Sequence, residues 1–586
     1  MGGGGSISSS KTGAATFTGI NINSFVGATT FYSAGYTGTS STIANVEGGL
    51  IWNGHSTLGH VTTDISAPAS TPEFDWHATE VGFVLGGHLP EGLGYTPGYD
   101  TGISYNSKLE SGSIAVTYPT TNNGIYYGQD LFGYTNGAAA YAYYNTMTNA
   151  SGNRANVVNS SWNGGSDTTG AGTLDRFVDA LTYQQGTAVV VSAGNSGYGN
   201  NRITDLAAAF NTITVGSTGS DINAPFYSAV SSFSSGGPSN YADNTGTVKG
   251  VRARVDLVAP GQDLTVAYYD GPTGSNKGLT QTQRDPAPYI VQSPSPNGTS
   301  TLYDQREDGT SYSAPIVAGG ASLLVDAGQT LYGGITGATD GRLLKAILMN
   351  SAAKLVGFKN GSTIDPLTGA LVTTQALDYS QGAGQVNLAA AYGQYTSGDH
   401  GIALTAGSGN IGAVGWDYNS VSRGASNDYF FTSPLNGGSA MTATLDWFMG
   451  GSYTYSQADA NSQPTISAAA NRLENLDLNL YQVVSPGVYN LVSSSSAAYI
   501  TTQQIFFSLP NSGSYMLQVM DVGAQYDTGT IPGPTSYALA WSDTGATNSL
   551  APTSSAAAPE PGALALLLLP LTAGGGLLTS RRRRAR

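Results

Sequence analysis

The chain has 586 residues, a length that usually divides into two or more domains, and it contains no cysteine. Disulfides, thiol catalysis and cysteine-ligated zinc are therefore excluded. Charged residues make up 10% of the chain and the net charge is −15, although five of the 22 basic residues lie in the arginine cluster that ends the chain. An acidic body lacks the basic face that phosphates require, so the composition argues against nucleic acid as a partner.

Residues 1–19 form an N-terminal extension in which no charged region is followed by an apolar core. A signal peptide would show both features. Because the C-terminal tail described below indicates export, we expect the natural start of the protein to lie upstream of Met1.

Apolar, strand-like runs alternate with helix-like runs between residues 20 and 395. This alternation predicts an α/β domain, in which helices cover both faces of a parallel sheet and the site lies at the carboxyl ends of the strands. The predicted strands are residues 113–116, 156–159, 187–191, 212–215 and 255–258. The predicted helices are residues 77–85, 136–147, 174–184, 313–327 and 341–352.

The strongest motif is Gly-Thr-Ser-Tyr-Ser-Ala-Pro at residues 309–315, which leads into an apolar run that predicts a helix. Ser311 would then lie at a helix N-terminus, where the helix dipole and backbone N–H groups surround its oxygen. The small residues around it allow a substrate backbone to approach closely. A second Gly-Thr-Ser sequence at residues 298–300 lacks the proline and the apolar helix, so we interpret it as part of an insertion loop.

Two further motifs supply a base and an amide donor. His77 opens a predicted helix among small residues, and none of the other four histidines has such a setting. Asn195 follows the predicted strand 187–191 within Ala-Gly-Asn-Ser-Gly, where an oxyanion at the strand's carboxyl end would need a donor. The alternatives are a structural histidine and an ordinary asparagine turn.

These motifs, in this order along the chain, resemble those of the subtilisin-like serine proteases, or subtilases, over most of residues 20–395. The resemblance implies that Ser311 is the nucleophile, His77 the general base and Asn195 the oxyanion donor. It also implies a polypeptide substrate and no required cofactor. A substrate would pair as an edge strand with a segment made of Ser161, Trp162, Asn163 and Gly164.

The orienting acid is where this chain departs from the family pattern. The strand-like run at residues 43–49 ends in Val-Glu-Gly-Gly, so Glu47 stands where the family has an aspartate. A glutamate carboxylate can also orient an imidazole and stabilise its charged form. Asp64 is the main rival, whereas Asp75 is too close to His77 in sequence to reach behind its ring easily.

Residues 398–546 consist of short alternating segments separated by turn residues, a pattern that predicts an antiparallel β-sandwich. The region weakly resembles the jelly-roll domains of some bacterial subtilases. Such domains sometimes hold structural Ca²⁺, for which Asp477 offers an oxygen ligand, although a solvated strand face is the plainer interpretation of this residue. The predicted strands include residues 443–448, 476–481, 504–508 and 514–519.

Residues 547–558 form a linker, and residues 559–586 form a tail with Pro-Glu-Pro, an apolar stretch and an arginine cluster. The tail resembles the PEP-CTERM sorting signal. The resemblance implies export from a bacterial cell, transient membrane contact and processing by an exosortase-type enzyme. A plain tail anchor is the alternative, and both place the body outside the cytoplasm, secreted or in the cell envelope.

The sequence leaves three functions to compare: an active serine endopeptidase, an inactive subtilase-fold binding protein, and a surface-attached structural protein. The glutamate at position 47 is the only sequence feature that favours inactivity, whereas a dead site has no need to keep Ser311, His77 and Asn195 together. The same His77 and Asn195 argue against a sedolisin-like Ser-Glu-Asp site.

Overall fold

The computed structural model describes residues 2–5, 21–88, 101–119, 129–148, 150, 154–219, 226–243, 245–280, 290–292, 302–401 and 410–544. The predicted linker and tail, most of the predicted N-terminal extension and the second Gly-Thr-Ser sequence lie outside these residues. The described residues belong to a single folded unit. Within them, no helix combines the length and the apolar character needed to cross a membrane.

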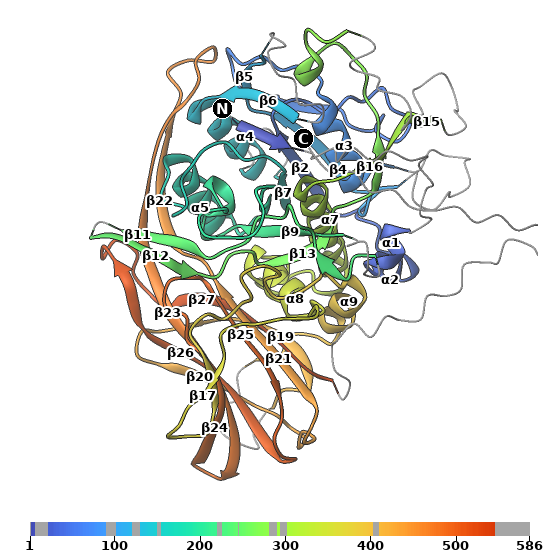
Figure 1. Cartoon of the computed structure of the whole chain (residues 1–586). Helices are drawn as coiled ribbons and strands as arrows, with labels where there is room; N and C mark the ends of the chain where they lie inside the picture. Colours follow the sequence, from blue (N-terminus) through green and yellow to red (C-terminus); the bar gives the residue numbers. More distant parts are fainter. Residues whose placement is uncertain are drawn as a thin grey trace, which may run out of the picture. The chain divides into compact units, whose positions relative to one another are not determined.

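A mainly parallel sheet forms the centre of the region before residue 395 (Figure 1). All its strand pairs are parallel except that of the short β10 with β9. The predicted α/β architecture is therefore confirmed. In spatial order, the strands are β10 (Ala229–Val230), β9 (Ile213–Gly219), β8 (Ala188–Ser192), β7 (Val157–Ser160), β2 (Thr42–Glu47), β4 (Lys108–Ser113) and β3 (Thr63–Ser66). An eighth strand, β13 (Leu257–Pro260), lies outside this order and pairs with β9.

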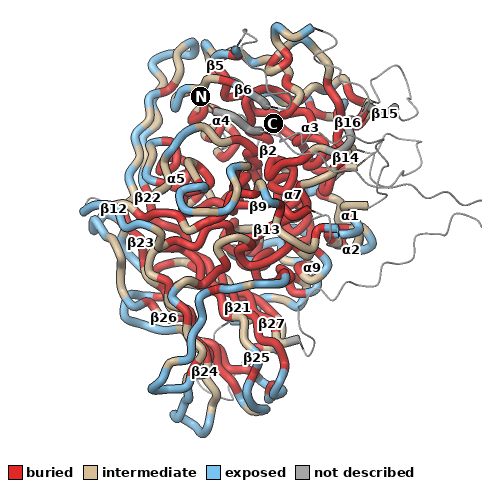
Figure 2. The backbone as a smooth tube through the Cα atoms, viewed as in Figure 1, coloured by how far each residue is buried: buried red, intermediate tan, exposed pale blue. Residues whose placement is uncertain are grey.

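Helices cover both faces of this sheet because successive strand residues point to opposite sides. Val157 packs into a core with α3, α7 and α8, whereas its neighbour Val158 packs into a second core with α4 and α5. The longest of these helices, α7, is buried along its first 19 residues (Figure 2). The helices are α3 (Trp76–Gly86), α4 (Asn136–Met147), α5 (Thr173–Gln185), α7 (Thr310–Leu331) and α8 (Gly341–Asn350).

One predicted strand is wrong. Residues 113–116 span the end of β4 and the start of β5 (Ala115–Thr117), which belongs to a separate three-stranded sheet. The strand that belongs to the main sheet, β4, was not predicted because its sequence is polar. Glu110 on this strand is nevertheless buried, and Ser111 accepts a hydrogen bond from the Ile51 N–H at 2.8 Å. A buried strand can therefore be polar where its groups are paired, as Ser111 is by this hydrogen bond and Glu110 is by an ion pair with Lys108 at 3.3 Å.

The remaining elements before residue 400 are short and lie around the sheet. The helices are α1 (Ile22–Phe25), α2 (Ala28–Ser33), α9 (Leu388–Thr396) and two 3₁₀ turns, Asp205–Ala207 and Gly274–Asn276. The strands are β1 (Gly2–Gly5), β6 (Gln129–Tyr134), β11 (Ser239–Asp243), β12 (Gly246–Arg252), β14 (Leu264–Ala267), β15 (Ile290–Gln292), β16 (Leu302–Glu307), β17 (Thr363–Ile364) and β18 (Leu371–Thr373).

The region after residue 398 forms two largely antiparallel sheets with a common core that includes Trp447, Leu478 and Trp541. The predicted antiparallel β-rich region is therefore present. Two strands run far beyond their predicted ends, and their outer portions consist mainly of intermediate and exposed residues, which give no apolar pattern in the sequence. The strands are β19 (Val414–Val421), β20 (Ser426–Phe430), β21 (Ala440–Trp447), β22 (Gly450–Ser456), β23 (Thr465–Ser485), β24 (Val488–Ser495), β25 (Thr502–Ser508), β26 (Ser514–Asp527) and β27 (Thr535–Thr544).

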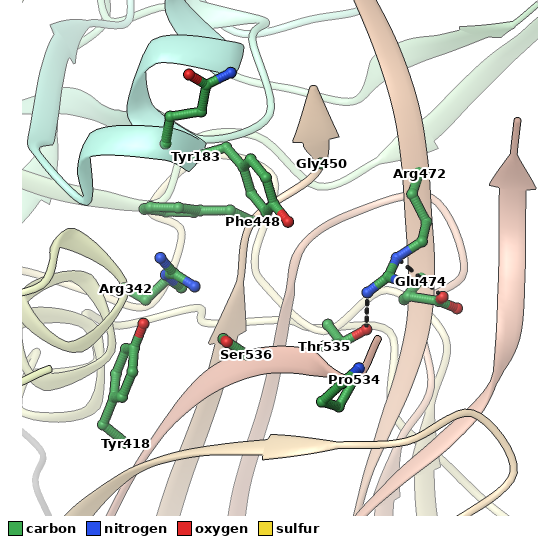
Figure 3. Close-up of a pocket in the computed structure, with 11 residues that line it drawn as sticks. Tyr183, Arg342, Tyr418, Phe448, Gly450, Arg472, Glu474, Pro534, Thr535 and Ser536 are labelled. Carbon is green, nitrogen blue, oxygen red and sulfur yellow. Dashed lines mark hydrogen bonds and ion pairs between the residues drawn. The ribbon is translucent and has the colours of Figure 1, made fainter. Parts of the chain in front are cut away.

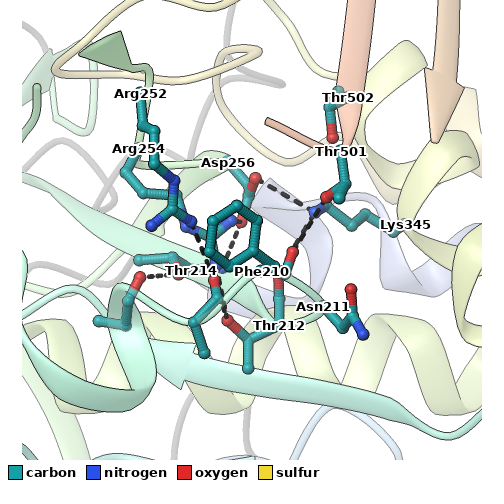
Figure 4. Close-up of polar contacts among 12 residues, drawn as sticks. Phe210, Asn211, Thr212, Thr214, Arg252, Arg254, Asp256, Lys345, Thr501 and Thr502 are labelled. Carbon is teal, nitrogen blue, oxygen red and sulfur yellow. Dashed lines mark hydrogen bonds and ion pairs between the residues drawn. The ribbon is translucent and has the colours of Figure 1, made fainter. Parts of the chain in front are cut away.

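A row of buried charges joins the α/β region to the antiparallel region (Figure 4). Lys345 on α8 lies 3.4 Å from Asp256 and 3.3 Å from Asp446 on β21. Arg254 in turn contacts Asp256 at 2.6 Å. Burial raises the pKa of Asp446 to about 6 even with Lys345 beside it. Opposite charges therefore alternate along this seam, and each depends on its neighbours for the solvation that water no longer supplies.

A polar cavity of about 320 Å³ lies along the same seam, between α5, α8 and the antiparallel strands (Figure 3). The guanidinium of Arg342 lies 4.7 Å from the ring centroid of Phe448 and is paired with Asp340. Arg472 donates to two backbone carbonyls and to Thr535, and it contacts Glu474. Both cations of the cavity therefore have partners within the protein, and Arg342 on α8 contacts the antiparallel region through Phe448.

We predict that Lys345→Met destabilises the protein by about 3–5 kcal/mol, because it leaves the buried Asp446 without a cation and Asp256 with Arg254 alone. The measurement is the urea midpoint of unfolding, with Lys249→Met on an exposed stretch of β12 as the matched control. Adding Asp446→Leu to Lys345→Met should recover part of the loss. Equal midpoints for Lys345→Met and Lys249→Met would contradict the importance of the buried charges.

Candidate active site

Ser311 is the second residue of α7 and is buried at the start of that helix. Gly309 precedes the helix in an extended conformation, and its N–H donates to the Gly261 carbonyl at 2.7 Å. Ser313 ties the same turn to the end of β13 by donating to Ala259 at 3.0 Å. The hydroxyl of Ser311 therefore sits where the helix dipole favours negative charge, on a turn anchored to the sheet.

Pro315 has a specific effect on the serine. A proline inside a helix removes the N–H that would bond to the carbonyl four residues earlier, which here belongs to Ser311. That carbonyl instead accepts a hydrogen bond from the Ser161 hydroxyl at 2.9 Å. The proline of the Gly-Thr-Ser motif thus permits a contact between α7 and the end of β7.

His77 and Glu47 form a fully buried pair. Glu47 ends β2 and His77 is the second residue of α3, and 3.3 Å separates Glu47 Oε2 from His77 Nδ1. The other carboxylate oxygen of Glu47 accepts a hydrogen bond from the Ser161 N–H at 2.6 Å. Burial raises the pKa of Glu47, whereas His77 and the Ser161 N–H oppose that rise. The predicted acid therefore lies behind the predicted base.

The two other candidate acids lie elsewhere. Asp64 is exposed on β3, which is separated from β2 by β4. Asp75 caps the N-terminus of α3, since its side chain accepts a hydrogen bond from the Ala78 N–H at 3.1 Å and another from the Ser275 N–H at 2.9 Å. Only Glu47, of the three candidates, contacts the His77 ring.

Ser161 connects the pair to the serine. The Ser311 hydroxyl donates to the Ser161 carbonyl at 3.1 Å, and the Ser161 N–H donates to Glu47. His77 Nε2 makes no hydrogen bond within the described part of the chain. Ser311 and His77 therefore make no direct hydrogen bond in this structure, although both belong to one buried cluster. Such bonds are often long or misaligned in the absence of substrate.

Asn195 lies in the loop after β8 and is joined to the residue before the serine. Its Oδ1 accepts from the Thr310 N–H at 3.0 Å and from the Thr310 hydroxyl at 2.9 Å. Because a backbone N–H can only donate, this contact fixes which end of the amide is oxygen. The Asn195 NH₂ group is therefore directed away from Thr310.

Part of the predicted substrate segment is already hydrogen-bonded within the protein. The backbone of Ser161 already contacts Glu47 and Ser311. The Trp162 side chain is buried and donates to the Val46 carbonyl at 3.1 Å. Asn163 and Gly164 are half-buried. Pairing of this segment with a substrate stays a prediction.

Among the described residues, one group of three acidic side chains has oxygens within 4.8 Å of one another: Glu80, Asp304 and Glu307. Asp477, the predicted calcium ligand, is not among them. Its Oδ1 makes no hydrogen bond to the described residues, and burial raises its pKa to about 6. Structural calcium stays a prediction.

The serine, the histidine–carboxylate pair and the asparagine loop lie along the carboxyl edge of one parallel sheet. A fold and a site of this kind define an α/β serine-type peptidase. A comparison with family models assigns the chain further, since residues 53–384 match the model of the subtilase family, Peptidase_S8. The chain belongs to the subtilase family. A search of the curated proteins found no match.

The family match begins downstream of Glu47, so it carries no information about the acid. Geometry alone identifies Glu47 as the partner of His77. Sequence reasoning named Ser161 only as a substrate contact and missed that its backbone links the acid to the serine, because backbone contacts leave no signal in the residue type.

We predict that Glu47→Gln lowers kcat for peptide hydrolysis by about 10⁴, because an amide no longer fixes the tautomer of His77 or stabilises its charge. The amide oxygen can still accept from the Ser161 N–H, so the fold should persist. Asp64→Asn is the control and should hydrolyse peptide at the wild-type rate. A large loss in Asp64→Asn and none in Glu47→Gln would reverse the assignment.

Proposed function

We propose that this protein is a serine endopeptidase that acts through an acyl-enzyme. One observation carries the proposal: Glu47 lies 3.3 Å from the ring of His77, and Ser161 joins the same carboxylate to Ser311. Membership of a serine-type peptidase family supports it. The polypeptide substrate would pair along the segment after β7, which favours cleavage within a chain because such pairing can extend past both sides of the bond.

In this mechanism the Ser311 hydroxyl turns from the Ser161 carbonyl toward His77, and its oxygen attacks the substrate carbonyl carbon. His77 Nε2 takes the hydroxyl proton while Glu47 stabilises the imidazolium. The oxyanion is held by the Asn195 NH₂ group and by the Ser311 N–H, which belongs to the first helical turn and lacks an intrahelical partner. His77 then protonates the leaving amine, and water releases the acyl group by the reverse sequence. These residues supply every group the chemistry needs, so we propose that no cofactor takes part.

The setting of the reaction is proposed from the composition of residues 559–586. We propose that the protein is exported from a bacterial cell, with transient membrane contact through residues 559–586 and processing there by an exosortase-type enzyme. The Pro-Glu-Pro, apolar and arginine-rich segments support this. Mature protein found free in the medium without residues after 558 would support processing, whereas a chain that keeps its tail in the membrane would support a plain anchor.

An inactive binding protein with the same fold is the second candidate, favoured only by the glutamate at position 47. We expect wild-type protein to react with a fluorophosphonate probe and Ser311→Ala to remain unlabelled, because only an activated serine attacks such a probe. An internally quenched peptide blocked at both ends should be cut by the wild type alone. Absence of labelling in a folded wild type would favour the binding protein.

We predict that Asn195→Asp lowers kcat by about 10²–10³ with a small change in KM, because it removes the donor but keeps an oxygen for Thr310. Asn195→Ala, which removes both, should lose as much activity and also lower the unfolding midpoint. The measurements are steady-state kinetics and thermal unfolding. Wild-type kcat in Asn195→Asp would exclude this side chain from the oxyanion site.

A further inference from the structure

The hydroxyl of Tyr312, the residue after Ser311, lies between two carboxyl groups. It is 2.5 Å from Glu80 Oε2 and 3.2 Å from Glu307 Oε2. Tyr312 and Glu80 are both buried. The buried phenol and the buried Glu80 carboxyl each need a hydrogen-bond partner, because burying such groups alone is costly.

The three residues come from the elements that surround the catalytic groups. Glu80 follows His77 by three positions on α3, so both lie on one side of that helix. Tyr312 follows Ser311 on α7, and its ring lies 6.3 Å from that of His77. Glu307 ends β16, the strand that leads into α7. The phenol therefore links the helix of the base to the helix of the nucleophile.

Tyr312 has one hydroxyl proton, which cannot serve two carboxylate oxygens fully at once. Burial raises the pKa of Glu80 well above its usual value, the charges of Glu307, Asp304 and Asp75 add to the rise, and the hydrogen bond from Tyr312 opposes it. The contact with Glu80 is the shorter of the two, so Glu80 is the main hydrogen-bond partner of the phenol.

We propose that Glu80 and Tyr312 are positioning residues, whose hydrogen bond fixes α3 against α7 and so sets His77 at transfer distance from Ser311. This rests on the proposed function. Neither residue touches the reacting atoms, and sequence reasoning gave neither a role. A misplacement of about 1 Å can cost about 10²-fold in rate, so a buried contact between the two helices is a sensitive determinant of kcat.

The first test compares Tyr312→Phe with Tyr395→Phe, which also loses a buried hydroxyl contact, at 2.6 Å to the Ala338 carbonyl, but on α9. We expect Tyr312→Phe to lower kcat by about 10–100-fold with KM nearly unchanged. Tyr395→Phe should lower the unfolding midpoint and leave kcat at the wild-type value. Equal kcat in the two variants would overturn the proposal.

The second test keeps or removes the hydrogen bond at position 80. The amide oxygen of Glu80→Gln can still accept from the phenol, so its kcat should stay within a few-fold of the wild type, whereas Glu80→Leu should lose as much as Tyr312→Phe. Glu80→Gln as slow as Glu80→Leu, with both folded, would overturn the proposal. Wild-type protein that neither reacts with a fluorophosphonate nor cuts peptide would overturn the proposed function as well. The wild-type assays therefore test the proposed function, and the variants test the positioning role separately.

Discussion

A carboxylate with no access to water is the constraint on which the site depends. Glu47 is fully buried at the end of β2, where an isolated charge would be too costly to keep. Its two oxygens are met by the His77 ring and by the Ser161 N–H. The Ser161 carbonyl also accepts a hydrogen bond from the Ser311 hydroxyl. The contacts around this one carboxylate therefore connect the ends of β2 and β7 with the starts of α3 and α7. The contacts that stabilise the buried Glu47 carboxylate are therefore the same contacts that position His77 and Ser311.

Two glycines in closely packed positions follow the acid. A Cβ at Gly48 would lie 2.5 Å from the Phe132 ring, and one at Gly49 would lie 2.4 Å from the Cβ of Asp75. Asp75 caps the helix that carries His77, so the second glycine lets that helix end approach the strand end closely. This close approach helps to set the separation across which Glu47 meets His77.

The sequence was informative where function depends on residue type and uninformative where it depends on backbone atoms or distant pairs. Glu47 and His77 could be predicted because both lie in motifs that resemble those of the family, at the end of a strand-like run and at the start of a helix-like run. β4 could not, since its buried groups are polar. The partnership of Glu80 with Tyr312 joins residues 232 positions apart, and nothing local marks either one. The burial of β4 and the pairing of Glu80 with Tyr312 both arise only in the assembled fold.

The antiparallel region forms one folded unit with the α/β region and is not a separate domain after it. β18, from before residue 395, pairs with β24 of the later sheet. The loop between β22 and β23 reaches back to α4, where Thr135 donates to Gln463 at 2.6 Å. Thr135 adjoins Tyr134, whose ring lies 5.1 Å from that of Trp162. A continuous set of contacts therefore runs from the later strands to the segment beside Ser311. The pattern change near residue 398 marks a change of architecture, but the two regions remain in contact across it.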